Sequence, residues 1–188
     1  MAWLTTEQIQ LLGFASVGKN VLLSGKSSYY NCSNIRIGDY TRIDDFCVLS
    51  AGLGGIFIGR NVHLAVYSLL IGAGKITLCD FSGISSRVAI YSSNDDYSGA
   101  GMTNPTVSID FSNVKHSDVT IGRHVIIGSG SVILPGVTLE IGVAVGALSL
   151  VKKNCKEFGV YFGSPAVRVA ERKRDLLKLE QDFLQKFP

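Results

Sequence analysis

The chain has 188 residues, a length that fits one domain and can bury a substantial core. Charged residues make up 18% of the chain, hydrophobic residues 46%, and glycine occupies 21 positions, a balance that argues against disorder. The net charge of +3 is small and no dense run of Lys and Arg precedes the C-terminal tail, so we expect no binding to nucleic acid.

The N-terminal stretch MAWLTTEQIQ and the four cysteines bear on where the protein works. The stretch has no basic segment followed by an apolar one, and no apolar run in the chain approaches the roughly 18 residues of a membrane span. Cys32, Cys47, Cys79 and Cys155 lie far apart without CxxC spacing, which favours thiols over disulfides or metal ligands. We therefore expect no membrane contact and no metal, and a reducing cytoplasm as the location.

The first predicted element is a short helix within residues 1–13. Thr5 or Thr6 offers a polar cap, Glu7 follows in the first turn, and Gly13 ends the helix. About two turns of helix suffice to cover the open end of a repeat array, and residues 14 onward form such an array.

Aliphatic side chains recur every six residues between positions 119 and 156. The series is Ile121, Ile127, Ile133, Leu139, Val145 and Val151. Four residues after each comes a small or β-branched side chain: Val125, Ser131, Val137, Val143, Ser149 and Cys155. A period of six fits neither a helix nor a simple strand, but it fits a short strand plus a corner, as in a parallel β-helix. We expect six glycines to give the corners their backbone freedom: Gly122, Gly128, Gly130, Gly136, Gly142 and Gly146.

The six-residue repeats, or hexads, that precede residue 119 are less regular. They begin at Val17, slip after Leu49 and again around residues 70–75, and recover from Leu78 onward. Slips of a few residues are bulges or small loops at a corner and leave a stack of coils intact.

Residues 94–118 lose the period and carry polar and titratable side chains that the coils mostly exclude. A loop of this length inside a compact fold is uncommon and is more often functional than ornamental. We therefore expect it to form part of a functional site.

The tail, residues 164–188, follows a break at Gly163 and Pro165. Its apolar residues are roughly helix-spaced: Val169, Leu176, Leu177, Phe183 and Leu184. The sequence thus predicts an all-β solenoid in one domain over residues 1–188, with an N-terminal helix in 1–13, a β-helix over 14–163 interrupted by the loop 94–118, and an amphipathic helical tail.

The hexads, the late loop and the segments IIGSGSVILPGVTL, VGALSLVKK and FGSPAVRV resemble the hexapeptide-repeat acyltransferases. The resemblance spans residues 14 to about 172. Within that superfamily it favours galactoside- and maltose-type O-acetyltransferases and the sugar acetyltransferases of bacterial O-antigen and capsule synthesis. It implies a left-handed parallel β-helix and a homotrimer with active sites at subunit boundaries. The implied reaction moves an acetyl group from acetyl-CoA to a hydroxyl or amine of a sugar or nucleotide-linked sugar, in surface polysaccharide synthesis.

The resemblance also implies which residues contact the acyl-CoA co-substrate. Carried over residue by residue, they are Gly128, Ser129, Gly146, Ala147, Lys152, Gly163, Pro165, Arg168 and Arg172. The two arginines would serve the coenzyme A phosphates. The alternatives are structural, with glycine and alanine as tight corners and Arg168 as a surface charge.

The catalytic position departs from the family pattern, because the run IYSSN is followed by Asp95 where the family's usual His would stand. Acyl transfer still needs a group that takes a proton from the acceptor. His124 and His116 are the candidates, each oriented by Asp95 or Asp96 across the site. His63, in the hexad IGRNVH, is expected at a surface or an interface. The structural alternatives are an interface hydrogen bond for the histidines and an Asx-type turn for the acids.

Asn94 and Tyr97, beside the two acids, suggest a polar, hydroxyl-rich acceptor. Two other functions fit the sequence less well. A γ-class carbonic anhydrase needs three imidazole ligands, and its close His-x4-His pair is missing here. A non-catalytic β-helix scaffold would leave the loop and the acyl-CoA segments without a purpose.

Overall fold

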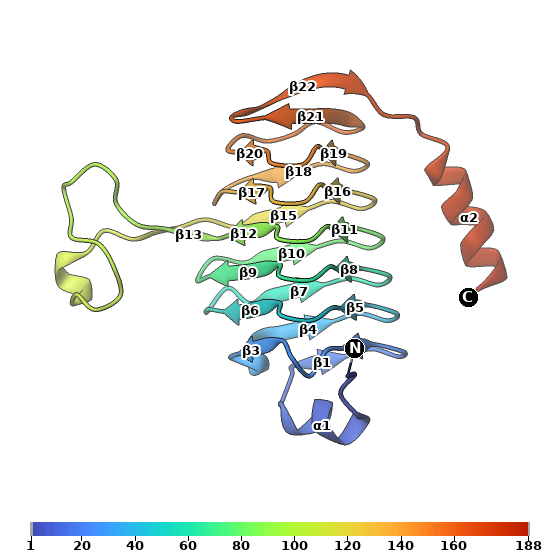
Figure 1. Ribbon diagram of the computed structural model, residues 1–188, viewed down its shortest axis with the longest axis horizontal. Helices are drawn as coiled ribbons and strands as arrows, with labels where there is room; N and C mark the ends of the chain where they lie inside the picture. Colours follow the sequence, from blue (N-terminus) through green and yellow to red (C-terminus); the bar gives the residue numbers. More distant parts are fainter. Residues whose placement is uncertain (1, 188) are drawn as a thin grey trace.

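The computed structural model describes residues 2–187; residues 1 and 188, the ends of the predicted domain, lie outside the described residues. The chain winds into a parallel β-solenoid whose coils each lay one short strand on three sheets (Figure 1). The predicted all-β solenoid, with a helix at each end of the chain and one long loop, is confirmed.

We call the three sheets face 1, face 2 and face 3 in chain order. Face 1 contains β1 (Ser16–Val17), β4 (Ile35–Ile37), β7 (Ile56–Ile58), β10 (Ile76–Leu78), β15 (Val119–Ile121) and β18 (Thr138–Leu139). Face 2 contains β2 (Leu22–Leu23), β5 (Arg42–Ile43), β8 (His63–Leu64), β11 (Gly83–Ile84), β16 (Ile126–Ile127), β19 (Ala144–Val145), β21 (Gly159–Gly163) and β22 (Ala166–Glu171). Face 3 contains β3 (Ser28–Tyr30), β6 (Val48–Ala51), β9 (Leu69–Gly72), β12 (Ala89–Tyr91), β17 (Val132–Ile133) and β20 (Leu150–Val151).

Corners join the faces. Corner 1 leads from face 1 to face 2, corner 2 from face 2 to face 3, and corner 3 from face 3 to the next coil. The remaining elements are α1 (Thr6–Leu11), the 3₁₀ turns Cys32–Asn34 and Ile109–Phe111, β13 (Ser93–Asn94), β14 (Lys115–His116) and α2 (Leu176–Lys186). No helix within residues 2–187 has the length and apolar character needed to cross a bilayer.

The hexad positions form the core. The six aliphatic residues of the series from Ile121 to Val151 are at most 3% exposed, and the six small residues from Val125 to Cys155 at most 2%. Because side chains alternate along a strand, the neighbours of each inward residue point outward and form vertical columns on the three faces. The inward assignment of both series is therefore confirmed.

Glycine is required at the corners for two different reasons. Gly130, Gly136 and Gly142 have a positive φ, as expected from the sequence. The other three do not, and for them the expectation of backbone freedom was wrong. A Cβ on Gly128, for example, would lie 2.5 Å from the backbone nitrogen of Ala147 in the next coil, so close stacking of coils requires glycine there.

Helix α1 covers the first coil, as predicted. The Thr5 hydroxyl accepts a hydrogen bond from the Gln8 backbone N–H, and the Gln8 side chain accepts one from the Thr5 N–H at 2.9 Å. This capping box stabilises a helix of only six residues. Leu4 and Ile9 pack against the core of the solenoid.

The predicted helical tail is helical only in its second half. Residues Ala166–Glu171 instead form β22, which pairs antiparallel with β21 and covers the last coil. A solenoid ends in an exposed strand edge, and pairing with β22 satisfies it. Val169, counted from its spacing as part of the helix, lies in this strand and is 59% exposed. Helix α2 then runs back along the side of the coils (Figure 1).

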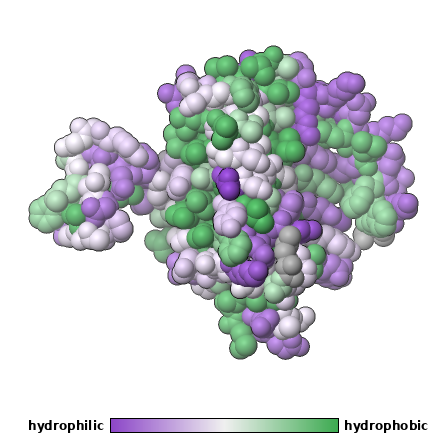
Figure 2. All heavy atoms as spheres, in the orientation of Figure 1, coloured by the Kyte–Doolittle hydropathy of each residue, from purple (hydrophilic) through white to green (hydrophobic). Residues whose placement is uncertain are grey.

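The loop 94–118 leaves the solenoid at corner 3. Strands β13 and β14 form an antiparallel ladder at its base, pairing Ser93 with His116 and Asn94 with Lys115. Beyond this ladder the loop stands away from the coils as a separate lobe joined by a narrow neck (Figure 2).

Neighbouring residues on β18 test the inward and outward assignment. Leu139 is fully buried, whereas Thr138 points outward. Leu139→Ala leaves a cavity in the core, so we expect the free energy of unfolding to fall by about 2–5 kcal/mol. Thr138→Ala, the matched control, should change it by no more than about 0.5 kcal/mol. Urea unfolding at matched protein concentration measures both; equal effects would contradict the assignment.

Candidate active site

Predicted acyl-CoA contacts stack in one column at corner 2. Ser129 and Ala147 occupy successive coils, where the Leu148 N–H donates to the Ser129 carbonyl at 2.9 Å. At the end of β21, which stacks on the coil of Ala147, the Gly163 N–H donates to the Ser149 hydroxyl at 3.1 Å. The coils thus bring Gly128, Ser129, Gly146, Ala147, Gly163 and Pro165 together along this corner. We call this column the corner 2 track.

The three cationic residues predicted beside acyl-CoA are not all on this track. Lys152 follows β20 at corner 3, on the other edge of face 3. Arg168, in β22, donates to the Glu171 carboxylate at 2.5 Å. Arg172 donates to the His124 carbonyl at 2.7 Å and holds the chain at corner 1 ahead of α2. Its guanidinium is therefore already engaged by the protein itself, through one of its nitrogens.

A notch opens on face 2 next to the track, with a volume of about 360 Å³. The residues that line it are His63, Ala65, Gly83, Ile84, Ser85, Ser86, Ile126 and Ser129. Ser129 belongs to both the notch and the track. The notch and the track therefore form one continuous surface.

A second cavity, of about 470 Å³, lies at corner 3 beside the base of the loop. Its lining includes three residues predicted from the sequence, Asn94, Asp95 and Tyr97, together with Tyr91. Asp95 is a free acceptor there, because its carboxylate has no hydrogen-bond partner within residues 2–187. The corner 3 cavity therefore offers a carboxylate, an amide and two phenols to a polar ligand.

Asp96, next in the chain, is committed to the loop itself. Its carboxylate accepts hydrogen bonds from the Ser98 N–H and hydroxyl and from the Gly101 N–H. The Ser98 hydroxyl above all, with these backbone donors, holds the pKa of Asp96 below its ordinary value. The Asx-type turn expected as the structural alternative to a catalytic role is thus present for Asp96. Asp95 is the acid that lines the cavity.

Face 3 separates these two surfaces, and from its second coil onward one of its outward columns is apolar. The outward column of this face runs in register through Val48, Leu69, Ala89, Val132 and Leu150. The notch and track lie along its corner 2 edge, and the corner 3 cavity along its other edge. One chain therefore carries two candidate binding surfaces on opposite edges of this face.

Comparison with known proteins shows which family the chain belongs to. It is 54% identical to a dTDP-4-amino-4,6-dideoxy-D-glucose acyltransferase of Escherichia coli over 183 residues, covering 97% of this chain and 95% of that protein. The chain belongs to the hexapeptide-repeat acyltransferase family. It is also 30% identical to WbbJ of Escherichia coli K12, a putative lipopolysaccharide biosynthesis O-acetyl transferase, over 83% of this chain and 87% of that one. No family model matches the chain.

Among solved structures, AntD, an N-acyltransferase from Bacillus cereus, superposes with a TM-score of 0.94. A variant in complex with dTDP-4-amino-4,6-dideoxyglucose and coenzyme A is 42% identical and covers 99% of both chains. Another AntD structure holds dTDP and 3-hydroxybutyryl-CoA. The predicted enzyme class, an acyltransferase, is confirmed, and acyl-CoA and nucleotide sugars are the ligands of these relatives. Membership of an acyltransferase family replaces the scaffold and carbonic-anhydrase alternatives.

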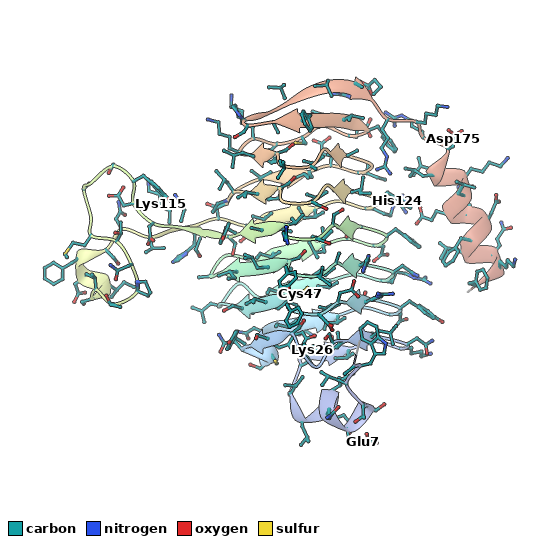
Figure 3. All side chains as sticks on the ribbon, viewed as in Figure 1. Glu7, Lys26, Cys47, Lys115, His124 and Asp175 are labelled. Carbon is teal, nitrogen blue, oxygen red and sulfur yellow. The ribbon has the colours of Figure 1, made fainter. Side chains whose placement is uncertain are left out.

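The histidine that the sequence favoured as this acyltransferase's base, His124, lies at corner 1 and faces neither acid of the loop. Its Nε2 atom is 2.9 Å from the Glu180 carboxylate of α2, and its ring stacks on Phe81 at 5.2 Å. The pairing with Asp95 or Asp96 is therefore wrong within one chain. Figure 3 shows His124 beside α2 and Lys115, at the base of the loop, on the opposite side of the solenoid.

His116, the second candidate, lies at the base of the loop. Its Nδ1 atom is 2.8 Å from the Ser93 hydroxyl, which also accepts a hydrogen bond from the Ala73 N–H at 2.7 Å. The ring is exposed. His116 therefore takes part in the ladder that holds the loop to corner 3, next to the cavity that contains Asp95.

Sequence reasoning missed the pair formed by His63 and Asp44 on face 2, and the serines of the notch. Asp44 follows the inward Ile43, and His63 precedes the inward Leu64 of the next coil. Strand alternation would place both side chains on the outside. That they are neighbours depends on how successive coils align, and the slips in the hexads hide this alignment from the sequence.

The ion pair under α2 yields a prediction. The side chains of His124 and Glu180 are 12% and 8% exposed, so His124→Ala should loosen α2 by about 1–2 kcal/mol. Hydrogen exchange over residues 176–186 should rise, while Lys178→Ala, an exposed control on α2, leaves it unchanged. We expect acyl transfer to survive. A loss on the order of 10²–10⁴ in kcat with α2 still protected would instead restore His124 as the base.

Proposed function

We propose that this protein acylates the amine of dTDP-4-amino-4,6-dideoxyglucose, or of a closely similar nucleotide sugar, with acyl-CoA as donor and acetyl-CoA as the first donor to test. The observation that carries the proposal is 54% identity, over nearly the full length, to an acyltransferase named for that sugar. AntD, 42% identical, binds both this sugar nucleotide and coenzyme A. An amine acceptor also suits the free carboxylate of Asp95, because a carboxylate pairs with an ammonium group.

The proposed place of this reaction is bacterial surface polysaccharide synthesis. Two relatives, the putative lipopolysaccharide O-acetyl transferase WbbJ and the putative colanic acid acetyltransferase WcaF, support it. The cytoplasm is the proposed location, since all four cysteines are free thiols and three of them are buried.

We further propose that the active form is a homotrimer in which two chains build each site. The apolar face 3 needs a partner, and three such faces can meet around a threefold axis. In that arrangement the corner 2 edge of one chain meets the corner 3 edge of the next. The track and notch of one subunit then face the loop cavity of its neighbour, which closes a site that a single chain leaves in two halves.

Each half-site has a proposed role. Acyl-CoA lies along the corner 2 track, where the small residues Ser129 and Ala147 let the pantetheine arm reach backbone groups. The sugar enters from the corner 3 cavity, where Asn94 and Tyr97 contact its polar groups. Asp95 binds the acceptor as an ammonium ion and relays its first proton to water, which leaves a neutral amine to attack the thioester.

The direct test is turnover with the purified protein. Coenzyme A release is followed with dTDP-4-amino-4,6-dideoxyglucose, its 4-hydroxy counterpart and a free amino sugar, each with acetyl-CoA and 3-hydroxybutyryl-CoA. We expect release only with the amino sugar nucleotide, and an amide in the product by mass spectrometry. Faster release with the hydroxyl acceptor would replace the N-acylation proposal by O-acylation.

Two inactive variants test the shared site. Ala147→Trp fills the track and should abolish acyl-CoA binding by calorimetry, because Ala147 is exposed and the fold tolerates the larger side chain. Asp95→Asn should bind acyl-CoA normally but lose acyl transfer. Refolding an equal mixture should restore about a quarter of the wild-type rate. A shared site takes its track from one chain and its loop from the next, and both parts are intact in about a quarter of the interfaces.

The matched control is Asp110→Asn, which changes another exposed loop acid whose side-chain partner among residues 2–187 is Ser108. It should keep wild-type activity. Absence of any recovery in the mixture, with trimers present by sedimentation, would show that each site is contained in one chain.

A further inference from the structure

His63 and Asp44 form a hydrogen-bonded pair on the outside of face 2. His63 lies in β8, and its Nε2 atom is 2.9 Å from the Asp44 carboxylate. Asp44 is 5% exposed, and its other oxygen accepts a hydrogen bond from Arg42 Nε at 2.7 Å. A buried carboxylate thus anchors one side of an imidazole whose side chain is 49% exposed.

The charge on Asp44 determines which nitrogen of His63 carries hydrogen. Burial raises the pKa of Asp44, but the hydrogen bonds from Arg42 and His63 outweigh it and leave this pKa below its ordinary value. An ionised carboxylate can only accept, so Nε2 carries the hydrogen and Nδ1 of the neutral ring keeps its lone pair. Within residues 2–187, Nδ1 has no hydrogen-bond partner.

The notch opens beside this ring because of Gly83. The outward column of face 2 runs from His63 through Gly83 to Ile126, one residue per coil. A Cβ on Gly83 would meet nothing within 4 Å, and its φ is not in the left-handed region. Neither backbone conformation nor packing within the chain requires glycine here, so the missing side chain leaves room for a ligand.

The other residues that line the notch suit the thioester end of an acyl-CoA. Ser85, Ser86 and Ser129 place hydroxyl groups on its rim, and none of these hydroxyls is hydrogen-bonded within the described chain. Ser129 also belongs to the corner 2 track, so a pantetheine arm on the track ends at the notch. Asp44 and its partner Arg42 are the charged groups beside the His63 ring, and apart from His63 itself the residues that line the notch are not titratable.

We propose that His63, oriented by Asp44, is a catalytic residue that transfers the proton during acylation. This proposal rests on the proposed function. The acceptor nitrogen attacks the thioester carbonyl carbon, and a C–N bond forms. Nδ1 of His63 takes the proton from that nitrogen, and the carboxylate of Asp44 stabilises the resulting imidazolium. The C–S bond then breaks, and the imidazolium returns the proton to the leaving sulfur, which yields the amide and free coenzyme A.

The proposal gives the loop acid and the face 2 histidine different tasks. Asp95 holds the acceptor before the reaction, and His63 acts while bonds change. The competing explanation is structural, with the pair merely tying two coils together. Kinetics can separate them, because a structural pair affects stability and assembly but not the pH dependence of the rate.

The experiment uses His63→Gln in the full-length protein. We expect kcat to fall on the order of 10²–10⁴-fold, with acyl-CoA affinity and sedimentation unchanged. The wild-type rate should decline on the acid side as an imidazole takes up a proton, and this decline should disappear in the variant. Asp44→Asn should lower kcat as well, because an amide can donate to Nε2 and favour the wrong tautomer. Arg42→Gln removes the hydrogen bond that does most to keep Asp44 ionised, so it should also lower kcat. Lys178→Ala, the exposed α2 variant, is the control and should keep the wild-type kcat.

Gly83→Val provides a second, independent variant. It fills the notch without backbone strain, so the protein should fold and assemble but lose acyl transfer. Activity of His63→Gln within about threefold of wild type, or a loss that accompanies failed assembly or failed acyl-CoA binding, overturns the proposal.

Failure of the proposed function can be told apart by a measurement that needs no acceptor. The imidazole signal of His63, assigned in NMR spectra by its absence from His63→Gln, should shift when acyl-CoA is added. If no acceptor is turned over but this signal shifts, the acceptor was chosen wrongly and the placement of His63 stands. If acyl-CoA binds and the signal does not shift, His63 is not at the thioester and the proposal is overturned.

Discussion

The outer surface of this protein depends on the inward aliphatic side chains that the faces contribute in each coil. Strands of two to four residues, such as β16 and β17, cannot form stable sheets alone. They are held because the inward residues of successive coils stack into a continuous core. A slip of one residue would turn every inward side chain outward, so the core also determines the register of the outside columns. The line from His63 through Gly83 to Ile126 is a direct consequence of that register.

The same construction gives a physical reason for the divided site proposed above. A solenoid has flat faces and no deep interior cleft, so a ligand that must be enclosed needs a wall from elsewhere. The loop 94–118 supplies such a wall, but it leaves the chain at corner 3, across the apolar face 3 from the track and the notch. Burying face 3 against neighbouring copies would remove apolar surface from water and would bring the two halves together in one step.

Most of the fold and about half of the candidate site could be predicted from the sequence. A period of six gives the inward residues directly, and the loss of that period at residue 94 gives the loop. Tail residues such as Val169 were misassigned because an exposed edge strand and a helix can share apolar spacing over a few residues. The contacts of His124 could not be read from the sequence, since its partner Glu180 is reached only when α2 folds back along the coils. His63 and Asp44 were missed because slips lengthen the coils before the loop, and strict counting by hexads misaligns them.

Two carboxylate–imidazole pairs of nearly identical geometry therefore occur in one chain, and their surroundings decide what each can do. Both have a nitrogen-to-oxygen distance of 2.9 Å. The ring of His124 is stacked on Phe81 and covered by α2, which leaves its side chain only 12% exposed, and its pair with Glu180 fastens a helix. The ring of His63 is half exposed and lies beside the space left by Gly83, where a substrate could bring a proton to its free nitrogen. Residue type and pairing alone identify both as possible bases, and only the presence of open space beside the free nitrogen separates them.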